Sequence, residues 1–282
     1  CAGGAVANVV VAASRLGLKT GFIGAVGDDE FGEFLINDFK KERVDISQIK
    51  RVKGVATGIA FYSVDKNGER HYVFYRFPGY SDTESALSLR DIRLDYLSRS
   101  KTLHFSESMI RREASRKTVF YTVRNCRRLG LTISYDPNVR LRLWGSRGKL
   151  LKTQREVLGL VDILLCTIEE LMLITGTKQL EYAIRATLRL GVNTIIIRSR
   201  DYYRVVTQEI DNSIPSFKVR AVDTSGAGDA FDAGFLAGVV KRLPLEEAVR
   251  LGGATAAIKI SKAGTRGGLP SMKEVQEFLR EK

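Results

Sequence analysis

Residues 223–235, with the sequence Asp-Thr-Ser-Gly-Ala-Gly-Asp-Ala-Phe-Asp-Ala-Gly-Phe, contain the residue types that phosphoryl transfer requires. Hydroxyl side chains mark the start of a helix, and the two glycines leave its first backbone amides accessible to an anion. A carboxylate beside such an anion site is explained if it accepts the proton of an attacking hydroxyl. The stretch therefore predicts Asp229 as a general base, with the backbone amides of Gly226, Ala227, Gly228 and of Asp229 itself as an anion hole. The alternative is a capped helix in which Asp229 interacts only with the helix dipole.

The same stretch resembles the C-terminal signature of the PfkB (ribokinase-like) sugar kinases, Asp-Thr-x-Gly-Ala-Gly-Asp-x-Phe-x-x-Gly-Phe, at every fixed position. Three further segments resemble motifs of that family in the family's order: residues 3–8, 22–32 and 136–140. The resemblance implies a ribokinase-like three-layer α/β/α fold with a mainly parallel sheet and a small β lid. It also implies phosphorylation of a small sugar or sugar acid with ATP and Mg²⁺.

On the sugar side, the resemblance implies that Gly4 and Asn8 bind sugar hydroxyls. Arg76 and Arg140 have counterparts in family members that act on fructose or on 2-keto-3-deoxygluconate. Because an arginine holds a carboxylate through two parallel hydrogen bonds, a pair of them near the pocket fits a sugar acid. The alternatives are a helix cap without a ligand for Asn8 and ordinary surface positions for the arginines.

On the nucleotide side, Thr167 and Glu170 match the family's Asn-x-x-Glu motif, with a hydroxyl in place of the amide, as in 2-keto-3-deoxygluconate kinases. The resemblance implies that Glu170 acts on Mg²⁺ through water, and the alternative is an acid on a helix surface. Ser199 stands where the family has a Gly-rich turn over ATP, but residues 198–204 contain no glycine. The remaining positions that correspond to ATP contacts are Thr224, Gly226, Gly228 and Gly264.

The start of the sequence also departs from the family. Family members begin with a β-strand that carries Gly-Glu or Asp and helps to hold the sugar, and no such strand precedes Gly3 here. We do not expect a lipid anchor at Cys1, because the chain continues directly into the sugar-binding turn.

Composition narrows the class of protein. With 282 residues, 44% hydrophobic and 27% charged, the chain is typical of a globular α/β protein, and no apolar run approaches the roughly 18 residues that cross a bilayer. The net charge is +13, but the basic residues are scattered, which favours anionic metabolites over nucleic acid as partners. The three cysteines lie far apart, which indicates reduced thiols in the cytoplasm and no zinc site. We find no P-loop and no dinucleotide-binding motif.

Hydrophobic periodicity predicts alternating strands and helices, which implies a parallel sheet covered on both faces with ligands at the carboxyl ends of its strands. The expected helices are 5–16, 30–42, 116–129, 169–174, 181–190, 227–240, 245–261 and 272–280, and the expected strands are 20–26, 131–135, 163–166, 194–197 and 219–222.

Residues 57–65 and 69–76 break this alternation, because two aromatic, β-branched runs flank Asn67-Gly68 and predict a hairpin. In the family such strands form a lid over the sugar and often a dimer contact, so we expect a homodimer through the lid. Tyr62 and Phe74 are candidates for the apolar inner face of the lid. The alternative is an edge hairpin without a function. The expected organisation is 1–44 and 79–282 as the main domain, with 45–78 as the lid.

The best single substrate on these residues is 2-keto-3-deoxygluconate, on account of Arg76, Arg140 and Thr167. Fructose follows, and then ribose or a nucleoside. The alternative from another class is a sugar-sensing protein without catalytic activity.

Overall fold

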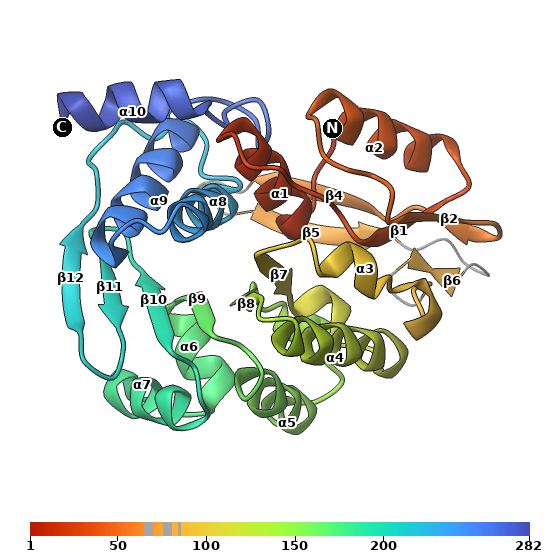
Figure 1. Ribbon diagram of the computed structural model, residues 1–282, viewed down its shortest axis with the longest axis horizontal. Coiled ribbons are helices and arrows are strands. Elements are labelled where there is room, and N and C mark those ends of the chain that lie inside the picture. Colours follow the sequence, from red (N-terminus) through yellow and green to blue (C-terminus); the bar gives the residue numbers. More distant parts are fainter. Residues whose placement is uncertain (65–69, 76–80, 84–85) are drawn as a thin grey trace.

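The computed structural model describes residues 1–64, 70–75, 81–83 and 86–282 of the chain. Its central sheet has six strands in the order β12-β11-β10-β9-β8-β7 (Figure 1). The four strands β7 to β10 are parallel, and β11 and β12 extend the sheet antiparallel, with β12 at its edge. Their bounds are β7 Thr102–Ser106, β8 Thr132–Asp136, β9 Ile163–Thr167, β10 Thr194–Arg198, β11 Tyr202–Val206 and β12 Asp211–Pro215.

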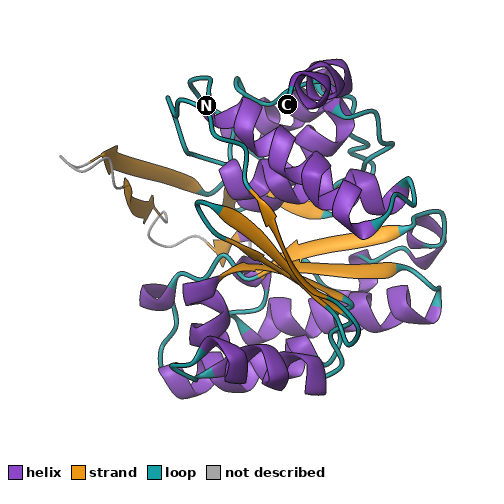
Figure 2. Ribbon diagram, turned by 90° about the vertical axis from the view of Figure 1, so that its left-hand side faces the viewer, coloured by secondary structure: helices purple, strands orange, loops and turns teal. Residues whose placement is uncertain are grey.

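Helices cover both faces of this sheet (Figure 2), as the alternating pattern predicts. One layer packs with buried residues of β8, β9 and β10 and consists of the crossover helices α4 Glu113–Arg128, α5 Arg147–Leu158, α6 Ile168–Thr175 and α7 Leu180–Arg189. The other layer consists of α1 Ala5–Arg15, α8 Ala227–Val240, α9 Leu245–Ile260 and α10 Met272–Glu281.

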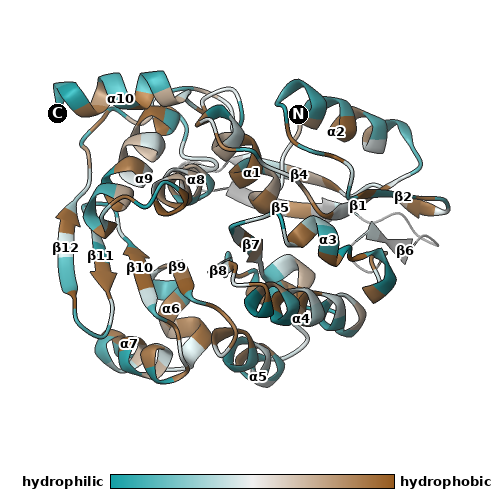
Figure 3. Ribbon diagram, viewed as in Figure 1, coloured by the Kyte–Doolittle hydropathy of each residue, from teal (hydrophilic) through white to brown (hydrophobic). Residues whose placement is uncertain are grey.

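Hydropathy follows this layering. The middle strand β9 reads Ile-Leu-Leu-Cys-Thr and is almost entirely buried, because helices cover it on both sides. The edge strand β12 reads Asp-Asn-Ser-Ile-Pro, and only its Ile214 is buried. Figure 3 shows the same contrast, with β12 mainly hydrophilic. None of the helices in the described part of the chain has the length and apolar character needed to span a membrane.

The N-terminal part of the chain builds a second, smaller unit. Strands β1 Gly24–Gly27 and β2 Ile49–Val52 form a separate parallel pair, and α2 Glu30–Lys41 connects them. Two short strands, β3 Val55–Ala56 and β6 Ser81–Asp82, also pair with each other. Other short helices among the described residues are α3 Leu94–Leu97 and the 3₁₀ turns Leu89–Asp91, Glu107–Met109 and Leu141–Leu143.

The predicted hairpin is confirmed. Strand β4 Ile59–Val64 pairs antiparallel with β5 Arg70–Tyr75, and Ile59 lies opposite Tyr75. Figure 2 shows the hairpin projecting from the layered body. The Asn67-Gly68 turn lies outside the described residues.

One predicted strand is wrong. Residues 219–222 form no strand, and the chain there runs beside the end of α9, where the backbone N–H of Val222 donates to the carbonyl of Ile260 at 2.7 Å. The β-branched pattern indicated an extended segment, but this segment bonds to a helix end and not to a sheet. The sequence analysis also missed the helices α3 and α5 and the strands β2, β3, β6, β7, β11 and β12.

Two cavities among the described residues differ in the polarity of their lining. A cavity of about 540 Å³ lies between β7, α1, α4 and residues 18–23, and its lining is mainly apolar. A smaller cavity of about 320 Å³ lies at the start of α8 and is lined mainly by polar groups. Since chemistry needs converging polar groups, the smaller cavity is the candidate site.

The contact between α8 and α9 gives a test of the packing. A methyl group on Gly234 would lie 2.5 Å from Oγ1 of Thr255 and 2.8 Å from the Cα of Gly252. We expect Gly234→Ala to lower the free energy of unfolding by about 1–3 kcal/mol, because the two helices cannot approach as closely. Urea denaturation measures it.

Gly148→Ala is the matched control, because no atom lies within 4 Å of the added methyl group and the residue is exposed in α5. We expect that variant to be as stable as the parent or up to about 1 kcal/mol more stable. Equal effects of the two substitutions would contradict the close-packing explanation.

Candidate active site

Three neighbouring parallel strands end at the same edge of the sheet, and each ends on a polar residue. Asp136 ends β8, Thr167 ends β9 and Arg198 ends β10. All three line the 320 Å³ cavity, and the start of α8 lines it as well. The site therefore lies where parallel α/β sheets commonly bind ligands, outside the carboxyl ends of their strands.

The first turn of α8 presents free backbone donors. Gly226 caps the helix in the left-handed region, with a φ of 72°, which favours glycine. The N–H of Ala227 donates to the carbonyl of Thr224 at 3.2 Å, whereas the N–H groups of Gly228 and Asp229 have no acceptor in the described chain. Orphan amides at a helix N-terminus form an anion site. Of the amides predicted to form the anion hole, those of Gly228 and Asp229 are therefore available to an anion, whereas that of Ala227 is engaged.

The turn before α8 is held by its own aspartate. The carboxylate of Asp223 accepts from the backbone N–H of Ser225 at 2.8 Å and from that of Gly264 at 2.9 Å. The buried Lys259 donates to the backbone carbonyl of Asp223 at 2.7 Å. These bonds fix the backbone that positions the orphan amides. Gly264 therefore supports the turn, and it is not among the residues that line the cavity.

Asp229 lies in the first turn of α8 and lines the cavity, although only 8% of the residue is exposed. Its Oδ2 accepts a hydrogen bond of 2.7 Å from the side-chain amide of Asn8, a residue of α1. Burial raises the pKa of Asp229 to about 7, and the bond from Asn8 opposes that rise. A carboxylate with this pKa can accept a proton near neutral pH.

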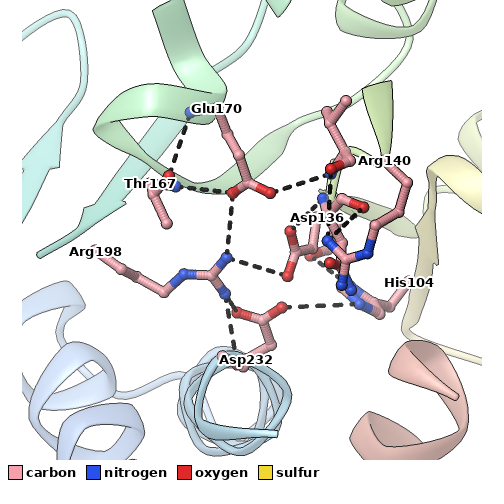
Figure 4. A network of polar contacts seen from close by, with 11 residues as sticks. His104, Asp136, Arg140, Thr167, Glu170, Arg198 and Asp232 are labelled. Carbon is pink, nitrogen blue, oxygen red and sulfur yellow. Dashed lines mark hydrogen bonds and ion pairs between the residues drawn. The ribbon is translucent and has the colours of Figure 1, made fainter. Parts of the chain in front are cut away.

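A buried guanidinium connects the strand ends to α8 (Figure 4). Nη1 of Arg198 donates to Asp232 and, at 3.4 Å, to the carbonyl of Gly228. Nη2 donates to Asp136 at 3.1 Å and lies 3.9 Å from Oε2 of Glu170. One cation therefore faces three carboxylates. Burial raises the pKa of Asp232 well above its ordinary value, and the attraction of Arg198 opposes this rise.

His104 lies on the far side of Asp232, with its Nε2 4.0 Å from Oδ2 of that carboxylate. Its other ring nitrogen is 3.1 Å from the hydroxyl of Ser134. Burial lowers the pKa of His104 to about 4, so the ring is neutral at pH 7. Arg198 is therefore the cation that balances this cluster.

Thr167 and Glu170 form a capping box at the start of α6. The Thr167 hydroxyl accepts from the N–H of Glu170 at 3.2 Å, and the Glu170 carboxylate accepts from the N–H of Thr167 at 3.0 Å. The second oxygen of Glu170 accepts from the N–H of Val139 at 3.1 Å. Burial raises the pKa of Glu170, and the nearby Asp136 raises it further. Both carboxylates line the cavity.

Arg140 lies at the exposed side of the same cavity. The chain turns into it through Asn138, which has a left-handed φ of 40° and whose N–H donates to Asp136 at 3.0 Å. The N–H of Arg140 donates to Glu107 at 3.0 Å, and this carboxylate also accepts from the indole of Trp144. The loop is thus fixed by its backbone, and the Arg140 side chain reaches the cavity.

The structure brings together most of the predicted site residues and leaves others apart. The predicted residues that line the cavity are Gly4, Asn8, Arg140, Glu170, Thr224, Gly226, Ala227, Gly228 and Asp229. Ser199 lies in the tight turn between β10 and β11, with its N–H bonded to the carbonyl of Tyr202 at 2.9 Å. Tyr62 and the backbone of Phe74 lie on the projecting hairpin, and Arg76 lies outside the described residues.

The sequence analysis missed Arg198, Asp232 and Arg266. A signal for Arg198 was available, because a charged residue directly follows an apolar strand whose carboxyl end faces the site. Asp232 follows Asp229 by three residues in an otherwise apolar helix, and this spacing puts both on the same side of it. No pattern in the sequence pointed to Arg266, whose Nε donates to Oδ1 of Asn8 at 3.2 Å behind the cavity, because this contact depends on the tertiary structure.

Comparison with known proteins gives consistent results. The model of the pfkB family carbohydrate kinases matches residues 1–272. The chain is 33% identical to the probable fructokinase-4 of Arabidopsis thaliana, over 99% of this chain and 87% of the relative. It is 31% identical to fructokinase-1 of Zea mays, over 98% of this chain and 88% of the relative.

Comparison with solved structures also finds sugar kinases. The fructokinase of Vibrio cholerae O395 in its fructose, ADP and calcium ion bound form superposes with a TM-score of 0.90 and 28% identity, over 99% of this chain and 91% of that one. The fructokinase of Xylella fastidiosa with bound ATP gives a TM-score of 0.90 and 26% identity, over 100% and 91%. A putative ribokinase II of E. coli in complex with ATP and Mg²⁺ gives 0.88 and 26%, over 99% and 89%.

The buried guanidinium of Arg198 gives a test of the electrostatics of the site. We expect Arg198→Met to lower the free energy of unfolding at pH 7 by about 3–5 kcal/mol, because it leaves buried carboxylates without their cation. The loss should be smaller at pH 5. Without Arg198 the folded-state pKa of Asp232 rises further above its unfolded value, so the folded state binds more protons and loses stability as pH rises.

Arg93→Met is the matched control, because Arg93 pairs with Asp95 at 2.8 Å on the exposed surface. We expect that variant to change stability by at most about 1 kcal/mol at either pH. Urea denaturation at both pH values measures the two variants. A loss for Arg198→Met that does not depend on pH would contradict the proposed charge balance.

Proposed function

Because the chain belongs to the pfkB family of carbohydrate kinases, we propose that it is a fructokinase that transfers the γ-phosphoryl group of ATP to a primary hydroxyl of fructose. The chain is a sugar kinase with the ribokinase-like fold. The observation that carries the proposed chemistry is the position of Asp229, a buried carboxylate with a pKa near 7 beside orphan amides. The names of the relatives and structural neighbours support fructose as the acceptor.

The choice of fructose revises the substrate ranking. The expectation of 2-keto-3-deoxygluconate as the first choice is not supported by these relatives, which are fructokinases. Arg140 lies at the cavity, and Arg76 lies outside the described residues. The structure therefore gives no support to a sugar acid held by a pair of arginines.

In the proposed mechanism, Asp229 accepts the proton of the sugar hydroxyl as its oxygen attacks the γ-phosphorus, and the bond to the bridging oxygen of the departing ADP breaks. The amides of Gly228 and Asp229 donate to the oxygens of the transferring group. They carry no net charge, so they can stabilise this anion without pairing with the nearby carboxylates. Water is largely excluded from Asp229, which strengthens these interactions.

The residues of the cavity fit Mg²⁺ held through water. Asp136 and Glu170 offer carboxylate oxygens, which Mg²⁺ prefers. No cluster of three or more His, Cys, Asp or Glu side chains suited to direct metal binding occurs within the described residues. We therefore propose that Glu170, with Asp136, binds a hydrated Mg²⁺. When bound, the ion would neutralise phosphate charge.

We place the enzyme in the cytoplasm and assign residues 45–78 as its lid. The cysteines are free thiols, and Cys126 and Cys166 are buried, as is common for proteins of reducing compartments. The assigned lid includes the strands β2 to β5, and its hairpin projects from the body (Figure 2).

A coupled assay of ADP release tests the proposed function. We expect sugar-dependent ADP production with the highest kcat/KM for fructose among fructose, 2-keto-3-deoxygluconate, ribose and a nucleoside. A higher value for another acceptor would replace fructose as the substrate. Binding of fructose without turnover would support the sugar-sensing alternative and contradict the proposal.

Asp229→Asn in the same assay tests the general base. The amide occupies nearly the same volume but cannot accept the proton, so we expect kcat to fall about 10²–10⁴-fold with fructose affinity retained. Asp95→Asn, on the exposed surface, is the control and should keep full activity. Near-normal turnover of Asp229→Asn would remove this residue from the mechanism.

We also propose that the hairpin forms a homodimer contact. Phe61, Val73 and Tyr75 lie on one face of it and are 60%, 64% and 42% exposed. Such clustered apolar side chains are typical of protein interfaces. We expect the double variant Phe61→Ser and Val73→Ser to have the mass of one chain in light scattering, and the parent twice that mass.

Leu129→Ser, which changes another exposed apolar residue, is the control and should remain dimeric. A parent protein with the mass of one chain at all concentrations tested would refute the dimer.

A further inference from the structure

A chain of buried polar contacts lies behind Asp229. Asn8 donates from Nδ2 to Oδ2 of Asp229 at 2.7 Å, and its Oδ1 accepts from Nε of Arg266 at 3.2 Å. Asn8 is 4% exposed and Arg266 is 8% exposed. The three residues come from α1, from α8 and from the loop between α9 and α10. The general base is thus connected to a guanidinium that does not line the cavity.

The two neighbours of Asn8 require one orientation of its amide. A carboxylate oxygen needs a donor, and a guanidinium N–H needs an acceptor. If the amide were reversed, its carbonyl would face the carboxylate of Asp229 and its NH₂ would face the donor of Arg266. Arg266 therefore selects the rotamer in which Asn8 donates to Asp229.

Arg266 is itself held firmly. Its Nη1 forms an ion pair with Asp38 of α2, and its guanidinium lies over the ring of Phe39, 5.3 Å from the ring centroid. Its Nη2 is buried without a hydrogen-bond partner among the described residues. An unsatisfied buried donor costs stability, so this placement of Arg266 calls for an explanation other than stability.

We propose that Arg266 is a positioning residue for phosphoryl transfer, which fixes the amide of Asn8 and thereby holds the Asp229 carboxylate in place for the sugar hydroxyl. This inference rests on the proposed role of Asp229 as the general base. It changes the role of Asn8 from binding a sugar hydroxyl to orienting the base. We call the contacts from Asp38 through Arg266 and Asn8 to Asp229 the relay. Helices α1, α2 and α8 therefore all contribute to the position of one carboxylate.

The relay also acts on the protonation of Asp229. The charged groups that face this carboxylate are Asp136 from β8, Arg198 from β10, Arg140 from the loop after β8 and Asp232 from α8 itself. The carboxylates raise the pKa of Asp229, and the arginines lower it. The hydrogen bond from Asn8 lowers it as well, so loss of a well-oriented Asn8 amide raises this pKa.

The main experiment is the pH profile of kcat/KM for Arg266→Met. We expect its acid limb to move up by about one pH unit, because Asp229 is a base only when unprotonated. With a parent pKa of about 7, turnover at pH 7 should then fall about fivefold, since the unprotonated fraction falls from about one half to one tenth. The KM for fructose should change little. An acid limb that stays in place would overturn the proposal.

Arg15→Met is the matched control. Nη1 of Arg15 donates to the backbone carbonyls of Arg266 and Leu269 at 2.8 and 2.9 Å, so it supports the same loop without contacting Asn8. We expect Arg15→Met to lower the melting temperature and to leave the acid limb in place. An equal shift in both variants would mean that loosening of the loop is sufficient, and it would overturn the specific role of Arg266.

A double-mutant cycle tests whether Arg266 acts through Asn8. In an Asn8→Leu background the amide is absent, so adding Arg266→Met should move the acid limb no further. Additive shifts would overturn the relay. Arg266→Lys keeps a cation beside Asp38, so the ion pair that stabilises the loop is preserved. Because lysine lacks the fixed fork of donors, we expect the acid limb of this variant to shift upward too.

A measurement without substrates separates this proposal from the proposed function. The carboxyl ¹³C signal of Asp229, assigned with Asp229→Asn, reports its pKa in the parent and in Arg266→Met. A rise in the variant, together with a parent that phosphorylates no sugar, would retain the relay and refute the kinase proposal. An unchanged pKa with normal sugar kinase activity in the parent would refute the relay alone.

Discussion

Negative charge buried at the carboxyl ends of the strands is the constraint on which this site depends. The cavity holds the carboxylates of Asp136, Glu170 and Asp229, and Asp232 lies directly behind them. A kinase must bring an anionic phosphoryl group to this place. Arg198 provides one buried positive charge, and burial raises the pKa of the carboxyls at Asp229, Asp232 and Glu170, which reduces their ionisation. The orphan backbone amides of α8 are suited to bind an anion without a further cation.

This constraint explains why the carboxylate that we propose as the base is not simply the most buried one. Asp232 is fully buried and interacts with Arg198, so its role is to balance charge. Asp229 is one helical turn earlier, lines the cavity and receives its support from the neutral amide of Asn8. Burial raises the pKa of Asp229 to about 7, and the hydrogen bond from Asn8 opposes that rise, so the carboxyl stays in the range where a base is most useful.

The site also links the two ends of the chain. Asn8 and Asp229 are 221 positions apart, and Arg266 lies 258 positions from Asn8. The packing of α1 against α8 makes these contacts possible. The geometry of the proposed general base therefore exists only in the fully packed protein, whereas the capping box of α6 needs only neighbouring residues.

Much of the protein is determined by local sequence. Hydrophobic periodicity predicted eight helices that the structure contains, and the residues before Asp229 indicated where α8 begins, because these features depend on neighbours along the chain. The segment 219–222 was wrongly predicted as a strand, since strand formation needs a partner that the local pattern does not specify. For the same reason, only the tertiary structure showed the positions of Arg198 and Arg266 and the contacts behind the proposed role of Asn8. Buried charges are placed by partners that are remote in sequence.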